Sequence, residues 1–126
     1  MEIDEEVRQE LIENLCEHLN AFKDVVNKII NRMRKAKTVE ELMRLKKRLL
    51  LVWLDSMPLS SAECYFCLLG KKVSVVMINA CKICNYGKLH KICLYEGSDY
   101  AKITEALRRA IKKIDKLYVK RGERYD

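Results

Sequence analysis

Apolar residues recur every three or four positions over the first 36 residues of the chain, which is the spacing of one buried helix face. They are Val7, Leu11, Leu15, Leu19, Phe22, Val26, Ile29 and Met33. Asp4 stands before them as an N-cap, and no Gly or Pro interrupts them. The pattern predicts a helix from about 4 to 36, roughly 50 Å long at 1.5 Å per residue. A helix longer than a compact domain of this size needs several partner helices, or a second copy of itself.

A second helix is predicted from the capping-box pattern at Thr38, with Glu41 three residues later, to about Leu54. Its apolar stripe is Leu42, Leu45, Leu49 and Val52. Pro58 disfavours helix in the residue before it and so marks the end of the segment. The short connection between the first two helices predicts an antiparallel hairpin. Because Trp53 falls within an apolar run, we expect it in the core.

A third helix is predicted from about Tyr100 to Arg121, capped by Ser98 or Asp99 and stopped by Gly122. Its seam, in steps of three and four, is Tyr100, Ile103, Leu107, Ala110, Ile114 and Leu117. Packing of this seam on the hairpin gives an all-α three-helix bundle. The bundle is expected to be one domain, 1–126, with a Cys-rich, knuckle-like insertion at 60–97. The competing use of the same seam is coiled-coil dimerisation.

Two Cys-x-x-Cys pairs lie in the insertion, Cys64 with Cys67 and Cys81 with Cys84. Each pair can offer two thiolates from one tight turn, so the four residues together suit a tetrahedral zinc site. A glycine follows each pair three positions on, and we expect these glycines to take positive φ where the chain turns back around the metal. The sequence therefore predicts a structural zinc ion held by these four cysteines.

Alternatives to this ligand set remain open, because His90 and Cys93 are two further candidate ligands. Either could replace one of the four cysteines. Disulfides are the main alternative to zinc, since abundant Lys, Glu and Ile favour a thermophilic source, where intracellular disulfides occur. An iron–sulphur cluster or reduced core cysteines are the other options. Cys16 lies beside the first helix's stripe and is expected to be a small core residue.

Charge is distributed unevenly along the chain. The net charge is +7, but residues 1–20 carry seven acids against Arg8, a sum of −6, which leaves +13 for residues 21–126. A basic body favours anionic partners, with nucleic acid, DNA or RNA, ahead of an acidic protein surface.

Basic residues follow the second and third predicted helices, where they could contact phosphates. The candidate nucleic-acid-binding residues are Arg44, Lys47, Arg48, Lys102, Arg109, Lys113, Lys116 and Lys120. Five of them, from Lys102 to Lys120, are expected to form a ridge along the third helix. The alternative interpretation is the ordinary solvated face of a Lys-rich protein.

Other classes of protein fit the sequence less well. The acidic start does not match a signal peptide, and the longest apolar run, 49–54, is far short of a membrane span, so a cytoplasmic protein without membrane contact is expected. No phosphate loop, acid pair or nucleophile constellation indicates an enzyme. The sequence predicts a small non-enzymatic nucleic-acid-binding protein, with a regulatory role as one option. The alternative is a homo-oligomeric scaffold stapled by disulfides, dimerising through the first or third helix.

Overall fold

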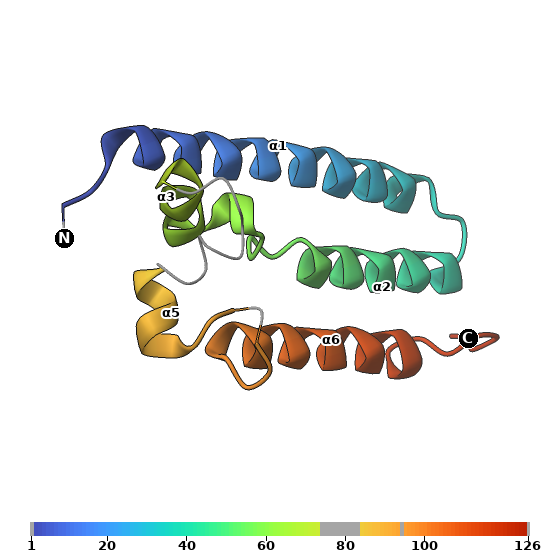
Figure 1. Cartoon of the computed structure of the whole chain (residues 1–126). Helices are drawn as coiled ribbons and strands as arrows, with labels where there is room; N and C mark the ends of the chain where they lie inside the picture. The colour runs from blue at the N-terminus through green and yellow to red at the C-terminus, as the bar shows by residue number, and fades with distance from the viewer. Residues whose placement is uncertain (1, 74–83, 94, 126) are drawn as a thin grey trace. The chain divides into compact units, whose positions relative to one another are not determined.

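The computed structural model of the chain describes residues 2–73, 84–93 and 95–125, and the helices are labelled along the chain in Figure 1. Its elements are α1 (Glu5–Lys35), α2 (Val39–Asp55), the 3-10 turn η1 (Ser61–Glu63), α3 (Tyr65–Val73), α5 (Asn85–His90) and α6 (Asp99–Leu117). The described residues contain no strand, and the all-α class is confirmed. A helical bundle is compatible with these elements.

The chain divides into two compact units, each with its own internal contacts. We name the first, residues 1–19 and 58–105, the cysteine unit because it contains all six cysteines. We name the second, residues 20–57 and 106–126, the basic unit. The long helix α1 thus contributes its first half to one unit and its second half to the other. This division answers the expectation that so long a helix needs more than one partner.

The basic unit contains the second half of α1, all of α2 and the second half of α6. Phe22 of α1 meets Trp53 of α2 edge to face, with ring centroids 5.1 Å apart, at about equal distances along the chain from the short connection. This is the contact of an antiparallel helix pair. On the other side, the ammonium of Lys47 bonds the carbonyl oxygens of Asp115 and Val119, 3.0 Å to the latter, where α6 ends. Lys47 therefore caps α6 from α2.

The cysteine unit is built on the first half of α1. Asn14 donates a hydrogen bond of 2.7 Å to the Ala62 carbonyl, and His18 pairs with the almost fully buried carboxylate of Glu63 at 2.9 Å. These two contacts attach η1 to α1. The phenol of Tyr65 accepts the Asp4 N–H at 2.9 Å, which attaches α3 to the start of the same helix.

Local capping signals in the sequence are confirmed at three helix starts. Asp4 accepts the Val7 N–H at 3.1 Å, and Thr38 accepts the Glu41 N–H at 3.1 Å. Ser98, fully buried, accepts the Ala101 N–H at 3.1 Å and donates to the Cys93 carbonyl. Each cap satisfies a backbone donor that the first helical turn leaves unpaired. The three long helices therefore begin where the sequence places them.

The end of the third helix and the nature of the insertion differ from the sequence expectations. α6 ends at Leu117, not near Arg121, and a turn follows in which Gly122 has φ 81°. The insertion is not a loop throughout, because α3 and α5 lie within it. The expected positive φ at Gly70 and Gly87 is wrong, since both are buried residues of these helices.

Several side chains expected in the core are exposed. On α1, Leu15 and Leu19 are 36% and 48% exposed, and Cys16 is exposed as well. The others are Leu42, Trp53, Ile103 and Leu117. The face of α1 that carries Asn14 and His18 is covered in the cysteine unit, whereas Leu15 and Leu19 beside it stay open to solvent.

Candidate functional site

The Cys64–Cys67 pair lies where η1 passes into α3. The Cys64 carbonyl accepts the Leu68 N–H at 3.0 Å and so starts α3, which places Cys67 one turn further along the helix. The Cys64 and Cys67 thiols are hydrogen-bonded to each other. Leu68, only 4% exposed, holds this turn against the start of α1. The two thiols of the first pair are thus positioned by buried packing of α3.

Cys84 caps α5. Its Sγ accepts the Gly87 N–H at 3.4 Å, which satisfies a backbone donor of the first helical turn. Tyr86 in the first turn of α5 packs on Phe66 of α3, with ring centroids 5.9 Å apart. This aromatic contact joins the helix capped by Cys84 to the helix that carries Cys67.

His90 and Cys93 follow at the end of α5. The His90 ring stacks on Tyr86 with centroids 4.4 Å apart, and its Nδ1 lies 2.6 Å from the Asp99 carboxylate. The Cys93 carbonyl accepts the Ser98 hydroxyl. These bonds tie the segment after α5 to the start of α6, within the cysteine unit.

Four thiols are close enough to interact. Burial is the main reason that the pKa of Cys67 is raised to about 12, followed by Cys64, through repulsion and a hydrogen bond, and then by Cys84 and Cys93. Cys64, Cys84 and Cys93, half-buried like Cys67, thus lie near enough to Cys67 to raise its pKa, and we name these four residues the thiol cluster. Cys16 on α1 is not part of this thiol cluster, and Cys81 lies outside the described residues.

The thiol cluster fits a soft divalent ion in its donor chemistry, since thiolates from two short turns are the usual ligands of structural zinc. In the described part of the chain, however, no three His, Cys, Asp or Glu side chains stand near enough together to hold a metal ion. A complete ligand set needs Cys81, or a closer approach of the described thiols. No disulfide joins any two of the described cysteines.

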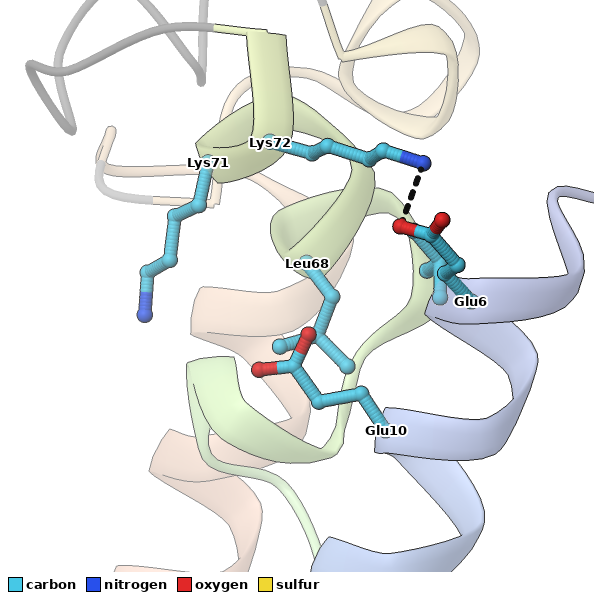
Figure 2. Close-up of a pocket in the computed structure, with 6 residues that line it drawn as sticks. Glu6, Glu10, Leu68, Lys71 and Lys72 are labelled. Carbon is cyan, nitrogen blue, oxygen red and sulfur yellow. Dashed lines mark ion pairs between the residues drawn. The ribbon is translucent and has the colours of Figure 1, made fainter.

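A pocket of about 280 Å³ lies between α1 and α3 in the cysteine unit. Val7 and Leu68 are its buried apolar lining, and Glu6, Glu10, Lys71 and Lys72 surround them. Figure 2 shows the Lys72 ammonium turned toward the Glu6 carboxylate, 3.1 Å away. Lys72 also contacts the Asp4 carboxylate at 2.8 Å. The charge of Lys72 is thus balanced within the protein, and the pocket is the packing junction of α3 on α1.

Most of the candidate nucleic-acid-binding residues are exposed, but Lys47 is largely buried and Lys120 lies outside the helix on which the ridge was expected. The exposed ones are Arg44, Arg48, Lys102, Arg109, Lys113, Lys116 and Lys120. The Lys47 side chain is 18% exposed and bonded to the end of α6. Lys120 lies beyond α6, in a turn where its N–H bonds Glu123. The helical part of the ridge in the basic unit is therefore Arg109, Lys113 and Lys116.

The two units carry opposite charge. The basic unit has 18 Lys and Arg against 7 Asp and Glu, a net charge of +11, and the cysteine unit has 7 against 11, a net charge of −4. Of the candidate nucleic-acid-binding residues, only Lys102 belongs to the cysteine unit. The excess positive charge of the chain thus lies in the basic unit.

Sequence reasoning missed one residue of the basic unit. Trp53 is 54% exposed, so the expectation of a core position is wrong. A signal was present, because Lys46 lies seven residues earlier, two helical turns, and shares the Trp53 face of α2. A lysine in the middle of an apolar stripe indicates a face open to water.

None of the helices that the structure describes is long and apolar enough to cross a lipid bilayer. Comparison with protein-family models, with curated proteins and with solved structures found no match to this chain.

Proposed function

We propose that the protein is a small non-enzymatic nucleic-acid-binding protein, in which the basic unit binds phosphates and the cysteine unit holds a structural zinc ion. The observation that carries the proposal is the concentration of +11 net charge in one folded unit. A phosphate backbone releases condensed counterions when lysines and arginines neutralise it, and this release drives association. A charge of this size in a unit of 59 residues favours a polyanion over a small anionic ligand.

Exposed cations on two helices of the basic unit support phosphate binding. Arg109, Lys113 and Lys116 are spaced four and three residues apart on α6, so they share one face of the helix. Arg44 and Arg48 are spaced four apart on α2 and are also exposed. Cations at these intervals share one helix face, from which they can contact successive phosphates along a strand.

The zinc ion would be structural. Cys64 and Cys67 would supply two thiolates from the start of α3, and Cys84 a third from the start of α5, with Cys81 or Cys93 as the fourth. When bound, zinc would contribute folding free energy by joining two short helices that have little core of their own. It would not need to touch nucleic acid.

Phosphate binding is tested by measuring affinity for a labelled oligonucleotide against salt. Replacing Lys113 and Lys116 with Gln should reduce the magnitude of the negative slope of log K against log salt by about 2, because each phosphate contact contributes about one unit of slope. The matched control replaces Lys71 and Lys88 with Gln, the same charge change in the cysteine unit, and should leave the slope unchanged. Equal effects of the two pairs, or no binding at low salt, would overturn the proposal.

The metal is tested by metal analysis and thiol counting on the native protein. About one zinc ion per chain with free thiols is expected, whereas paired-proton mass deficits would identify disulfides instead. Cys84→Ser should lower both metal content and melting temperature. Cys16→Ser, which changes an exposed thiol outside the cluster, should leave both unchanged.

Homo-oligomerisation is a second candidate function, favoured by the exposed apolar residues Ile12, Leu15 and Leu19 on α1. Leu15 and Leu19 were expected to be buried, and a second copy of the chain could cover all three residues. Sedimentation of the native protein and of Leu15→Glu tests this candidate. A dimer that the substitution converts to a monomer supports it, and a native monomer excludes it.

A further inference from the structure

Trp53 is the unusual surface residue of the basic unit. It is 54% exposed, although burying an indole side chain away from water is energetically favourable. Its edge-to-face contact with Phe22, at an interplanar angle of 86°, orients the indole without covering it. An aromatic ring held in place but open to solvent can bind a partner at low cost in side-chain entropy.

The face of α2 that carries Trp53 is both apolar and cationic. On α2, Val39 and Leu42 are 52% and 39% exposed, and Lys46 lies two turns before Trp53 on the same face. The whole unit carries +11. An exposed aromatic ring on a strongly basic surface is the combination by which proteins bind single-stranded nucleic acid, with the ring stacking a base and the cations following the backbone.

We propose that Trp53, oriented by Phe22, is a base-stacking residue and that the protein prefers single-stranded over duplex nucleic acid. This inference rests on the proposed nucleic-acid function and specifies the kind of nucleic acid. The face of a base is accessible in a single strand, whereas in a duplex it is covered by its stacked neighbours. A tryptophan on a helix surface therefore gains its stacking contact only when the strand is open.

Charge argues against a second copy of the chain as the occupant of this face. A symmetric pair formed through the Trp53 face of α2 would bring two units of +11 each together, and their repulsion would oppose association. A polyanion has the complementary charge. The same surface that repels its own copy thus attracts a phosphate backbone.

The chain has a single tryptophan, so fluorescence excited selectively at the indole reports on Trp53 alone. The full-length protein is titrated at low salt with an oligothymidylate, and separately with a DNA duplex of equal length. We expect the single strand to bind more tightly than the duplex and to quench the indole emission, because a stacked base lies against the ring. The duplex should bind through charge with little quenching.

Substitutions separate stacking from charge. Trp53→Ala should weaken single-strand binding by about 5- to 140-fold, which corresponds to about 1–3 kcal/mol per stacked base, without changing the salt slope. Trp53→Phe should restore much of the affinity, and it guards against a folding defect in the alanine variant. Lys46→Gln should lower the salt slope by about 0.7 and leave the quenching in place. Leu117→Ala, at another exposed apolar residue of the basic unit, is the matched control and should have no effect.

The outcomes distinguish this inference from the function on which it rests. Salt-dependent binding without quenching, and unaffected by Trp53→Ala, would overturn the stacking inference and leave nucleic-acid binding standing. Absence of binding to either probe would overturn both. A concentration-dependent blue shift of the emission, with a dimer in sedimentation, would assign the Trp53 face to a second copy and also overturn the inference.

Discussion

The cysteine unit and the basic unit use different means to hold short stretches of helix together. In the basic unit, α2 is long and contacts both other helices, with Trp53 on Phe22 and Lys47 on the end of α6. In the cysteine unit, α3 and α5 have nine and six residues, too few to be stable alone. Polar contacts to α1 and the thiol cluster, and not a large core, hold these two short helices. A cross-link is therefore expected where the helices are shortest.

The largest expected effect is loss of structure in the cysteine unit alone when metal is removed. If a zinc ion joins α3 to α5, a chelator should raise amide hydrogen exchange in both helices by orders of magnitude, because binding free energy is folding free energy there. The amides of α2 and of residues 106–117 should keep their protection. Exchange measured residue by residue checks this, and equal loss of protection in both units would contradict the comparison.

The corresponding cross-link of the basic unit is Lys47. Lys47→Met should lower the free energy of unfolding by about 1–3 kcal/mol, because the carbonyls of Asp115 and Val119 lose a charged donor at the helix end. Urea denaturation measures the change. Arg48→Met at the neighbouring exposed position is the control and should be near neutral. A similar effect at both positions would show that Lys47 acts by general charge alone.

Helix caps allow the two units to be compared by the same kind of substitution. Ser98→Ala should cost about 1–2 kcal/mol of stability, because the buried hydroxyl bonds both the Ala101 N–H and the Cys93 carbonyl. Thr38→Ala should cost about 0.5–1 kcal/mol of stability, since Thr38 is exposed and its hydroxyl caps the helix with a single hydrogen bond. Thermal or urea unfolding measures both, and the reverse order would contradict the burial argument.

The smallest expected effect is a pH dependence at the exposed carboxylates of the two units. The hydrogen bond from Lys72, followed by that from the Val7 N–H, lowers the pKa of Asp4 in the cysteine unit. The Tyr125 N–H lowers the pKa of Glu40 in the basic unit. A carboxyl group with a lowered folded-state pKa stabilises the protein above its unfolded-state pKa, and this contribution is lost as the pH falls through the folded-state value.

The measurement compares unfolding at acidic and neutral pH for the native protein, Asp4→Asn and Glu40→Gln. Each substitution should remove part of the acid sensitivity, with Asp4→Asn acting on protection in the cysteine unit and Glu40→Gln on that in the basic unit. Unchanged acid sensitivity in both variants would show that other groups carry it.

Much of the secondary structure follows from the sequence, and the candidate sites follow only in part. Asp4, Thr38 and Ser98 are caps that act within three residues, so a local reading places them correctly. The end of α6 is missed because Lys47, from another helix, bonds carbonyls near Leu117 where the helix stops. The helices α3 and α5 are missed because the cysteine spacing favours turns. The Cys93 carbonyl accepts the Ser98 hydroxyl, a contact that the spacing of the cysteines does not predict.

The sequence by itself determines where the long helices begin, that the fold is all-α, and that the cysteines and the basic residues occupy different stretches of the chain. These properties depend on caps, helical periodicity and composition, which act over a few residues. Only the tertiary structure decides which residues of an apolar stripe are covered. In the stripe of α1, Val7 and Ile29 are buried while Leu15 and Leu19 remain exposed, and Trp53 of α2 is exposed as well. Periodicity treats all members of a stripe alike, so which of them are covered depends on where a distant segment packs.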